Sequence, residues 1–216
     1  FDKNFLKENN ALPYLITSRG CPFHCKYCQS DAVWGGKVRF HSAEYIFDDI
    51  LEIKNLYPDD NRIIFKDDNF TVSIKFLEQL KEKKEKLEQI TGRQTYFIGS
   101  THVNFITHDL LKILKSLNVR KVNFGIETIS DKLLKIIRKS TTSKICQTAL
   151  DLCYEYKMDT GSSFLIGLPE ETEDDLKRTY EFTLKNLQNG KFLTTGTNLL
   201  TPLPDENSEY WKIAVK

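Results

Sequence analysis

Hydrophobic and polar positions follow two alternating patterns along the chain. Short runs rich in β-branched and aromatic residues, typical of buried strands, alternate with longer stretches that carry apolar residues at helical spacing. The short runs predict strands at 12–17, 63–66, 95–98, 121–126, 162–166 and 192–200. The longer stretches predict helices at 41–57, 71–90, 110–117, 132–138, 143–156 and 173–187. Strands and helices that alternate in this way form a parallel sheet with right-handed crossovers.

Six strand–helix repeats define the expected fold class, which is α/β. A complete barrel of eight repeats typically needs about 250 residues, whereas this chain has 216. We therefore expect one domain over residues 1–216, built as an incomplete six-repeat barrel or a doubly wound sheet. In both folds the ligand binds at the carboxyl ends of the strands. Polar and glycine-rich segments stand at five of those ends, at 18–20, 67–69, 99–101, 125–127 and 167–169.

Charge and composition remove several classes of function. The 31 basic and 30 acidic side chains give a net charge of +1, which favours neither a nucleic-acid binder nor an anionic-membrane binder. The lysine-rich stretch at 81–86 is interleaved with glutamates and predicts a solvated helix face. No apolar run approaches the roughly 20 residues that cross a bilayer. Because the chain also has no signal-peptide pattern, we expect a cytoplasmic protein. It begins with Phe1 rather than Met, so we expect a segment of a longer protein.

The five cysteines fall into two groups. Cys146 and Cys153 are seven residues apart on one predicted helix face, and we expect them to pack in the core. Cys21, Cys25 and Cys28 lie within eight residues of one another, in a loop after the first strand. The odd total and the lack of a secretory signal argue against a disulfide framework.

Three thiolates on one loop favour zinc or an iron–sulfur cluster over a hard cation. Structural zinc prefers four ligands, usually as two separated pairs. Here the nearby candidates for a fourth ligand are His24 and His41. A four-iron cluster fits the count better, because three cysteines then hold three irons and the fourth iron stays open for a small molecule.

The cysteine spacing resembles the signature of radical S-adenosylmethionine (SAM) enzymes. The motif is C-x-x-x-C-x-x-C, with Tyr27 before its last cysteine and Arg19-Gly20 ahead of it. Four further segments resemble motifs of the cobalamin-binding branch of that family: FKDDNF at 65–70, FGIET at 124–128, GLPEET at 167–172 and NLLTPLP at 198–204. The resemblance extends from about Leu12 to about Pro204.

This resemblance implies a partial (β/α)6 TIM-like barrel of the radical SAM type. It implies that Cys21, Cys25 and Cys28 hold a 4Fe-4S cluster, whose open iron binds the amino and carboxylate groups of SAM. An electron from the reduced cluster would cleave SAM to methionine and a 5′-deoxyadenosyl radical, which abstracts hydrogen from a small-molecule or other, unknown substrate. A reducing partner such as flavodoxin or ferredoxin would supply the electron. Cobalamin, where it is used, would come through a domain outside this segment.

The resemblance also points to individual residues of the cofactor site. Glu127 is expected to contact the methionine part or the ribose of SAM, although a helix-capping carboxylate is an alternative. Arg138 is expected to pair with the SAM carboxylate, because a guanidinium suits a bidentate contact. The alternative for Arg138 is a surface charge like those of Lys135 and Lys139 nearby.

The remaining candidates stand at other strand ends. Asp67 and Asp68 are adjacent, so we expect only one of them to reach the ligand. Ser163 stands where the coproporphyrinogen-oxidase-like branch carries an aspartate, and its hydroxyl could substitute. Ser100 is a weaker candidate for the ribose. Tyr27 and Gly167 complete the predicted cofactor-binding set.

Three alternatives remain open from the sequence. The radical reaction would be a cobalamin-dependent methyl transfer or a ring rearrangement. A relative of the RNA-modifying methylthiotransferases is a second possibility, although the neutral charge argues against it. The third is a non-enzymatic zinc or iron–sulfur domain that binds a partner.

Overall fold

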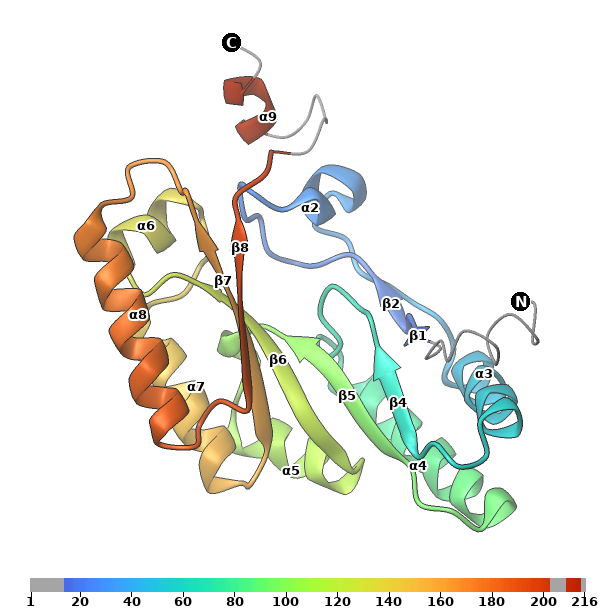
Figure 1. The fold of residues 1–216 in the computed structure, drawn as a ribbon. Helices are drawn as coiled ribbons and strands as arrows, with labels where there is room; N and C mark the ends of the chain where they lie inside the picture. Colours follow the sequence, from blue (N-terminus) through green and yellow to red (C-terminus); the bar gives the residue numbers. More distant parts are fainter. Residues whose placement is uncertain (1–13, 203–208, 215–216) are drawn as a thin grey trace.

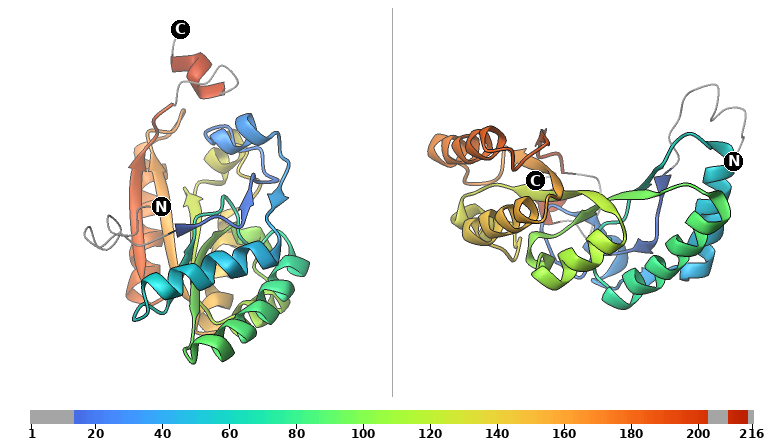
Figure 2. Two further views of the ribbon diagram at one scale, coloured as in Figure 1. Left: turned by 90° about the vertical axis from the view of Figure 1, so that its right-hand side faces the viewer. Right: turned by 90° about the horizontal axis from the view of Figure 1, so that it is seen from below.

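The chain forms a curved six-stranded parallel sheet with its helices on the convex side (Figures 1 and 2). The structure is a computed structural model that describes residues 14–202 and 209–214. The strand order is β1-β4-β5-β6-β7-β8. The strands are β1 (Tyr14–Leu15), β4 (Arg62–Phe65), β5 (Tyr96–Thr101), β6 (Val119–Glu127), β7 (Asp159–Ile166) and β8 (Thr194–Leu199). The expected α/β fold with an open, partial TIM-like barrel is confirmed. Residues 12 and 13 of the first predicted strand lie outside the described residues.

Each predicted helix is present. The helices are α3 (Ala43–Leu56), α4 (Ile74–Thr91), α5 (His108–Ser116), α6 (Asp131–Ile136), α7 (Ser143–Glu155) and α8 (Glu173–Gln188). The predicted helices at 41–57 and 71–90 begin two or three residues too early. The reason is that Ser42 and Ser73 are N-caps, whose hydroxyls accept hydrogen bonds from backbone N–H groups of the first turn while their own backbone stays extended.

The segment around the cysteines contains structure that the periodicity did not predict. Strand β2 (Ser18–Arg19) pairs antiparallel with β3 (Arg39–Phe40), and helix α2 (Gln29–Trp34) lies between them. The short helix η1 (Val103–Phe105) and α9 (Glu209–Ala214) were also not predicted. Elements of two to six residues are too short to show a hydrophobic period. The β2–β3 pairing closes the cysteine segment into a loop at the carboxyl end of the sheet.

The hydrophobic core lies between the sheet and its helices. Phe65, Phe97 and Phe124 point from neighbouring strands toward the helices and are each at most 1% exposed. The Phe65 and Phe97 rings stack with centroids 5.2 Å apart. Cys146 and Cys153 are fully buried in the same core, as predicted. No helix in the described part of the chain is long and apolar enough to span a membrane.

The register of the strands determines which side chains face the concave side. Ser100 of β5 is the partner of Asn123 in β6, which in turn is the partner of Gly161 in β7. Partners in a parallel sheet point to the same face, and the next residue along each strand points to the other. The alternate residues, such as Val122 and Phe124, are buried against the helices. At this level the concave face therefore carries small and polar side chains, while Ile64 and Ile98 lie on the same face one step lower.

Candidate functional site

The three clustered cysteines lie on the loop between β2 and β3, at the carboxyl ends of the strands (top of Figure 1). Cys25 is buried, Cys21 is half-buried and Cys28 is exposed, and all three are free thiols. Burial raises the pKa of each thiol, that of Cys25 to about 11. Among the described residues, no group of three His, Cys, Asp or Glu side chains is arranged to hold a single metal ion. The ligands of one zinc ion must converge to about 2.0–2.3 Å from it, whereas ligands to three separate irons of a cluster need not.

A buried carboxylate joins the start of this loop to the sheet. Asp67, just after β4, accepts hydrogen bonds from the Thr17 and Ser18 hydroxyls at 2.6 and 2.7 Å. Its carboxylate also accepts from both backbone N–H groups, at 3.2 and 2.5 Å. Asp67 is 5% exposed. Asp68 accepts from Gly20 N at 2.9 Å and from Ser30 Oγ at 3.0 Å, so it ties together the two sides of the cysteine loop.

These contacts correct the expectation for Asp67 and Asp68. The sequence predicts that one of the two carboxylates reaches the ligand and the other points away. In the structure both have partners in the cysteine segment: Asp67 in Thr17 and Ser18, and Asp68 in Gly20 and Ser30. Both carboxylates hold the loop in place within the chain.

Two further contacts fix the middle of the loop. The Phe23 ring stacks on His102, with centroids 3.9 Å apart, and Lys26 N donates to Ile137 O at 3.0 Å. His102 Nδ1 accepts from Asn104 N at 3.2 Å, so its proton lies on Nε2, which donates to Lys139 O at 3.1 Å. Burial lowers the pKa of His102 to about 4. A neutral imidazole therefore supports the loop.

A buried trio of polar side chains lies beside the loop. Lys139 Nζ donates to the Tyr27 hydroxyl at 2.9 Å, and this hydroxyl donates to Glu127 Oε1 at 3.0 Å. Lys139 and Glu127 also form an ion pair at 3.5 Å, with both side chains 8% exposed. Burial raises the pKa of Glu127, and the charge of Lys139 opposes that rise.

The backbone is shaped to present Glu127. Its φ of 70° lies in the left-handed region, and the β6–β7 register shifts between Gly125 and Glu127. Strained backbone and bulges of this kind cluster at functional sites. A Cβ atom on Gly125 would lie 2.3 Å from Glu127 Oε1, so only glycine leaves room for the carboxylate.

Comparison with known proteins identifies the family. The sequence profile of the Radical SAM superfamily matches residues 15–183. This chain belongs to the radical SAM superfamily. It is 29% identical over 204 residues to an uncharacterized methyltransferase of Pyrococcus horikoshii, which covers 93% of this chain and 41% of that relative. It is 28% identical over 177 residues to a putative methylthiotransferase of Methanocaldococcus jannaschii, which covers 78% of this chain and 38% of the relative. The chain thus spans about two fifths of both relatives.

Two solved structures share the fold. One is the radical SAM methyltransferase TsrM from Kitasatospora setae with cobalamin and a [4Fe-4S] cluster bound, with a TM-score of 0.72 at 17% identity over 87% of this chain and 34% of that chain. The other is the cobalamin-dependent SAM radical enzyme OxsB with aqua-cobalamin and SAM bound, with a TM-score of 0.68 at 19% identity over 82% of this chain and 27% of that chain. The family consists of enzymes, which removes the non-enzymatic alternative.

Within this radical SAM fold, the cation that contacts Tyr27 and Glu127 is Lys139 and not Arg138. Arg138 is exposed and lines a surface pocket on the outer side of the cysteine loop with His24 and Lys135. The expectation that Lys139 is a surface charge is wrong, because this residue is 7% exposed. The physical reason is that residues 138 and 140 have φ values of 52° and 55°, so the backbone after α6 leaves helical geometry and turns one side chain inward.

The other predicted residues occupy different levels of the barrel. Ser100 and Ser163 are half-buried on β5 and β7, within the sheet. Gly167 follows β7 with a φ of 82°, and its N–H donates to Glu171 Oε2 at 2.7 Å. The structure brings together Tyr27 and Glu127, two members of the predicted cofactor-binding set. It does not bring Gly167 into that group of contacts.

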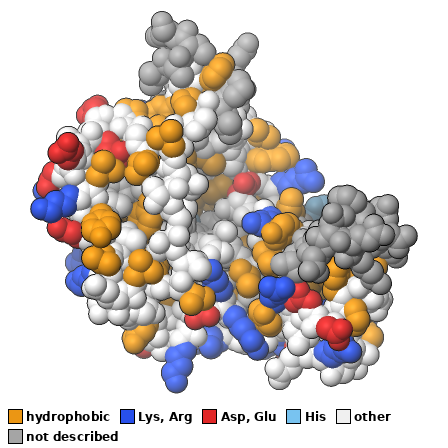
Figure 3. Space-filling model, viewed as in Figure 1, with side chains coloured by type: hydrophobic (Ala, Val, Ile, Leu, Met, Phe, Trp, Pro, Cys, Tyr) orange, Lys and Arg blue, Asp and Glu red, His pale blue; other side chains and the backbone are white. Residues whose placement is uncertain are grey.

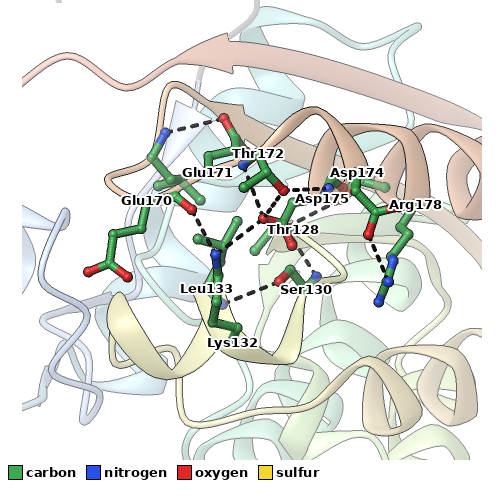
Figure 4. A network of polar contacts seen from close by, with 12 residues as sticks. Thr128, Ser130, Lys132, Leu133, Glu170, Glu171, Thr172, Asp174, Asp175 and Arg178 are labelled. Carbon is green, nitrogen blue, oxygen red and sulfur yellow. Dashed lines mark hydrogen bonds and ion pairs between the residues drawn. The ribbon is translucent and has the colours of Figure 1, made fainter.

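A polar network outside the site supports the strained strand end (Figure 4). The Thr128 hydroxyl accepts from Ser130 N at 3.2 Å and lies 3.3 Å from the Thr179 hydroxyl of α8. Hydrogen bonds from Ser130 and Thr172 lower the pKa of Asp175 to about 2. Lys132 Nζ donates to Glu170 O at 2.8 Å. The network joins the segment after Glu127 to the start of α8, and sequence patterns did not reveal it.

The Asp67 anchor gives a direct test. Asp67→Asn presents an amide N–H₂ to donors that need an acceptor, so we expect it to lower the free energy of unfolding by about 3 kcal/mol. We also expect less iron to be retained after anaerobic reconstitution. Asp59→Asn, at a fully exposed side chain, is the control and should change stability by less than about 0.5 kcal/mol. Equal urea midpoints for the two variants would contradict the anchoring role.

Proposed function

We propose that this chain is the catalytic core of an enzyme that cleaves SAM reductively at a 4Fe-4S cluster held by Cys21, Cys25 and Cys28. The observation that carries the proposal is the loop itself. Three thiols stand on one segment that is fixed at several strand ends, by Asp67 and by the Phe23–His102 stack among others. When bound, the cluster supplies the electron that breaks a C–S bond of SAM and leaves a 5′-deoxyadenosyl radical.

The chain's own residues position the cofactor and SAM. The three thiols are soft ligands, which suit iron. Because only three cysteines hold the four irons, the anchored backbone is needed to limit the movement of the thiols. The Lys139–Glu127 pair offers one ammonium and one carboxylate side by side in a buried place. Such a pair matches the carboxylate and amino groups of the methionine part of SAM, which carry the opposite charges. Tyr27 bridges Lys139 and Glu127 and so keeps both oriented.

We further propose that the reaction is a methyl transfer that uses cobalamin. The support is that one relative is named a methyltransferase and that both TsrM and OxsB, which share the fold, were solved with cobalamin. All six strands of the described sheet belong to the partial barrel. Cobalamin would therefore come from a domain outside these residues and meet the site at the carboxyl ends of the strands. A reducing partner such as flavodoxin or ferredoxin would deliver the electron.

The cysteines provide the first test of this proposal. A three-ligand site has no spare thiolate, so replacing Cys21, Cys25 or Cys28 with alanine should abolish the visible iron–sulfur absorbance and the content of about four irons. The matched control is Cys153→Ala, in the core, which should keep the iron at a cost of about 1 kcal/mol in stability. Iron retained by any of the first three variants, or lost from the control, would count against the assignment.

Slow release of 5′-deoxyadenosine from the reduced wild-type protein, with SAM and without substrate, is the activity expected in the same experiment. Its absence from fully loaded protein would contradict the proposed cleavage.

The second test compares two neighbouring cations. Lys139→Met should weaken SAM binding by about 10- to 100-fold, the equivalent of losing a charged hydrogen bond of about 1.5–3 kcal/mol. Arg138→Met, one residue away and exposed, should have little effect. Iron content measured on both variants separates loss of SAM binding from loss of the cluster. A larger effect of Arg138→Met would instead support the role predicted for Arg138 from the sequence.

The third test concerns cobalamin. This chain alone should bind it weakly, because its strands are committed to the barrel and three of its four histidines already have a ring nitrogen engaged. These are His24 with Asp31, His102 with Asn104 and Lys139, and His108 with the Tyr156 hydroxyl. Equilibrium titration followed by the cobalamin spectrum is the measurement. Tight one-to-one binding would show that the barrel itself holds the cofactor.

A further inference from the structure

The short helix η1 packs against the cysteine loop. It begins directly after β5, with His102 as its N-cap. The His102 ring stacks on Phe23 with an interplanar angle of 21°, and Phe105 and Phe23 form an edge-to-face pair with centroids 5.7 Å apart. Phe23 lies between Cys21 and Cys25 in the sequence. The side chains of one helical turn therefore hold the middle of the cysteine loop.

The same turn holds the segment that follows α6. His102 Nε2 donates to Lys139 O at 3.1 Å, and Asn104 Nδ2 donates to Ser140 O at 2.6 Å. The backbone N–H of Lys139 donates to Leu134 O at 2.9 Å, as is typical of a helix that ends in a left-handed residue. Both peptide groups of Lys139 are therefore fixed, one by α6 and the other by η1.

This segment needs support because its backbone is strained. Arg138 and Ser140 adopt φ values in the left-handed region, which costs free energy for any residue other than glycine. Such positions persist only where the surrounding contacts determine them. The two hydrogen bonds from η1 act on the residue between the strained positions and on the second of them. Without these bonds we expect the backbone to relax and the Lys139 side chain to lose its inward direction.

The direction of Lys139 depends on its backbone because the barrel is open. Figure 3 shows the molecule hollowed between its two halves, which leaves room for a small ligand to enter. An open rim does not enclose a side chain, so the direction of that side chain is set by how its own backbone is held. Lys139 Nζ nevertheless lies 2.9 Å from the Tyr27 hydroxyl and 3.5 Å from Glu127 Oε1, with its side chain 8% exposed.

A histidine at position 102 meets two demands at once. Its flat ring stacks on Phe23, and its Nε2–H donates to Lys139 O, while Nδ1 accepts from Asn104 N within its own turn. Phenylalanine would keep the ring and lose the donor, whereas glutamine would keep a donor and lose the ring. The two substitutions therefore separate the two contacts.

We propose that His102 and Asn104 are positioning residues that orient Lys139 for SAM binding. Their two hydrogen bonds keep the Lys139 ammonium group turned toward Glu127, and the stack on Phe23 ties the same helical turn to the cluster loop. The cation and the cluster ligands are then placed by one element at the end of β5. The identity of the ligand rests on the proposed function, but the orientation of Lys139 can be measured without SAM.

Lysine reactivity measures this orientation. The protein is acetylated at low reagent concentration, and each lysine is quantified by mass spectrometry. His102→Phe keeps a ring beside Phe23 but offers no donor to Lys139 O, so we expect Lys139 to react about five- to tenfold faster than in the wild type. Lys54 is also buried, and its Nζ donates to Asp60 O at 2.7 Å. Its rate should stay unchanged, which shows that the effect is local.

Three further variants make the test specific. His102→Gln keeps an N–H donor and should restore most of the slow reaction of Lys139. Asn104→Leu, at an exposed side chain, removes the second donor of η1 and should accelerate Lys139 several-fold. His108→Phe, an exposed histidine outside the site, is the matched control and should have no effect. Unchanged rates of Lys139 in both His102→Phe and Asn104→Leu would overturn the proposal, as would equal acceleration of Lys54.

SAM affinity tests the route of the effect. On cluster-loaded protein, with iron content measured in parallel, His102→Phe should weaken SAM binding about fivefold. In the Lys139→Met background the same substitution should weaken it no further, because His102 acts through Lys139. Equal weakening in both backgrounds would overturn the proposal. Unchanged SAM affinity of Lys139→Met alone contradicts the proposed function, whereas unchanged acetylation of Lys139 contradicts the positioning, so the two failures are distinguishable.

Discussion

One buried carboxylate determines how the cysteine segment meets the barrel. Asp67 accepts four hydrogen bonds from Thr17 and Ser18, the last residues before the loop turns toward Cys21. A buried charge is stable only when its partners satisfy it completely. The β4 end and the loop entry therefore form one unit, and neither can shift without leaving donors or the carboxylate unpaired. The positions of all three thiols depend on this junction.

The opposite side of the loop depends on a second, strained junction. Glu127 adopts a left-handed φ at a register shift, which costs free energy of the order of 1–3 kcal/mol. The surroundings offset this cost from two directions. Tyr27 and Lys139 hold the carboxylate inside the barrel, while the hydrogen-bond network from Thr128 to α8 fixes the backbone that follows. The strain is useful because it turns the carboxylate away from the sheet and toward the loop.

Sequence patterns predicted the repeating parts of the molecule and missed the local ones. The central strands β4 to β7 and the helices follow from periodicity because each buries an apolar face, whereas β8 is exposed throughout. The cysteine spacing alone located the candidate cluster. The patterns did not distinguish Lys139 from Arg138, since adjacent charges differ only in which way the backbone turns. Nor did they assign Asp67 and Asp68, because both turn toward the loop once the strand has ended. Two-residue strands such as β2 carry no period, and so they also escape sequence analysis.

The two faces of the sheet follow different physical rules. On the convex face, large side chains such as Phe97 and Phe124 fill the space under the helices, and their burial supplies the stability of the barrel. No helix of the described residues covers the concave face (Figure 2), so side chains there need not be apolar, and Gly161 and Gly196 add little to packing. Glycine weakens a strand. Glycine at positions 161 and 196 is explained if the concave face provides open volume for a ligand. The same fold thus separates stability and ligand space between the two sides of one sheet.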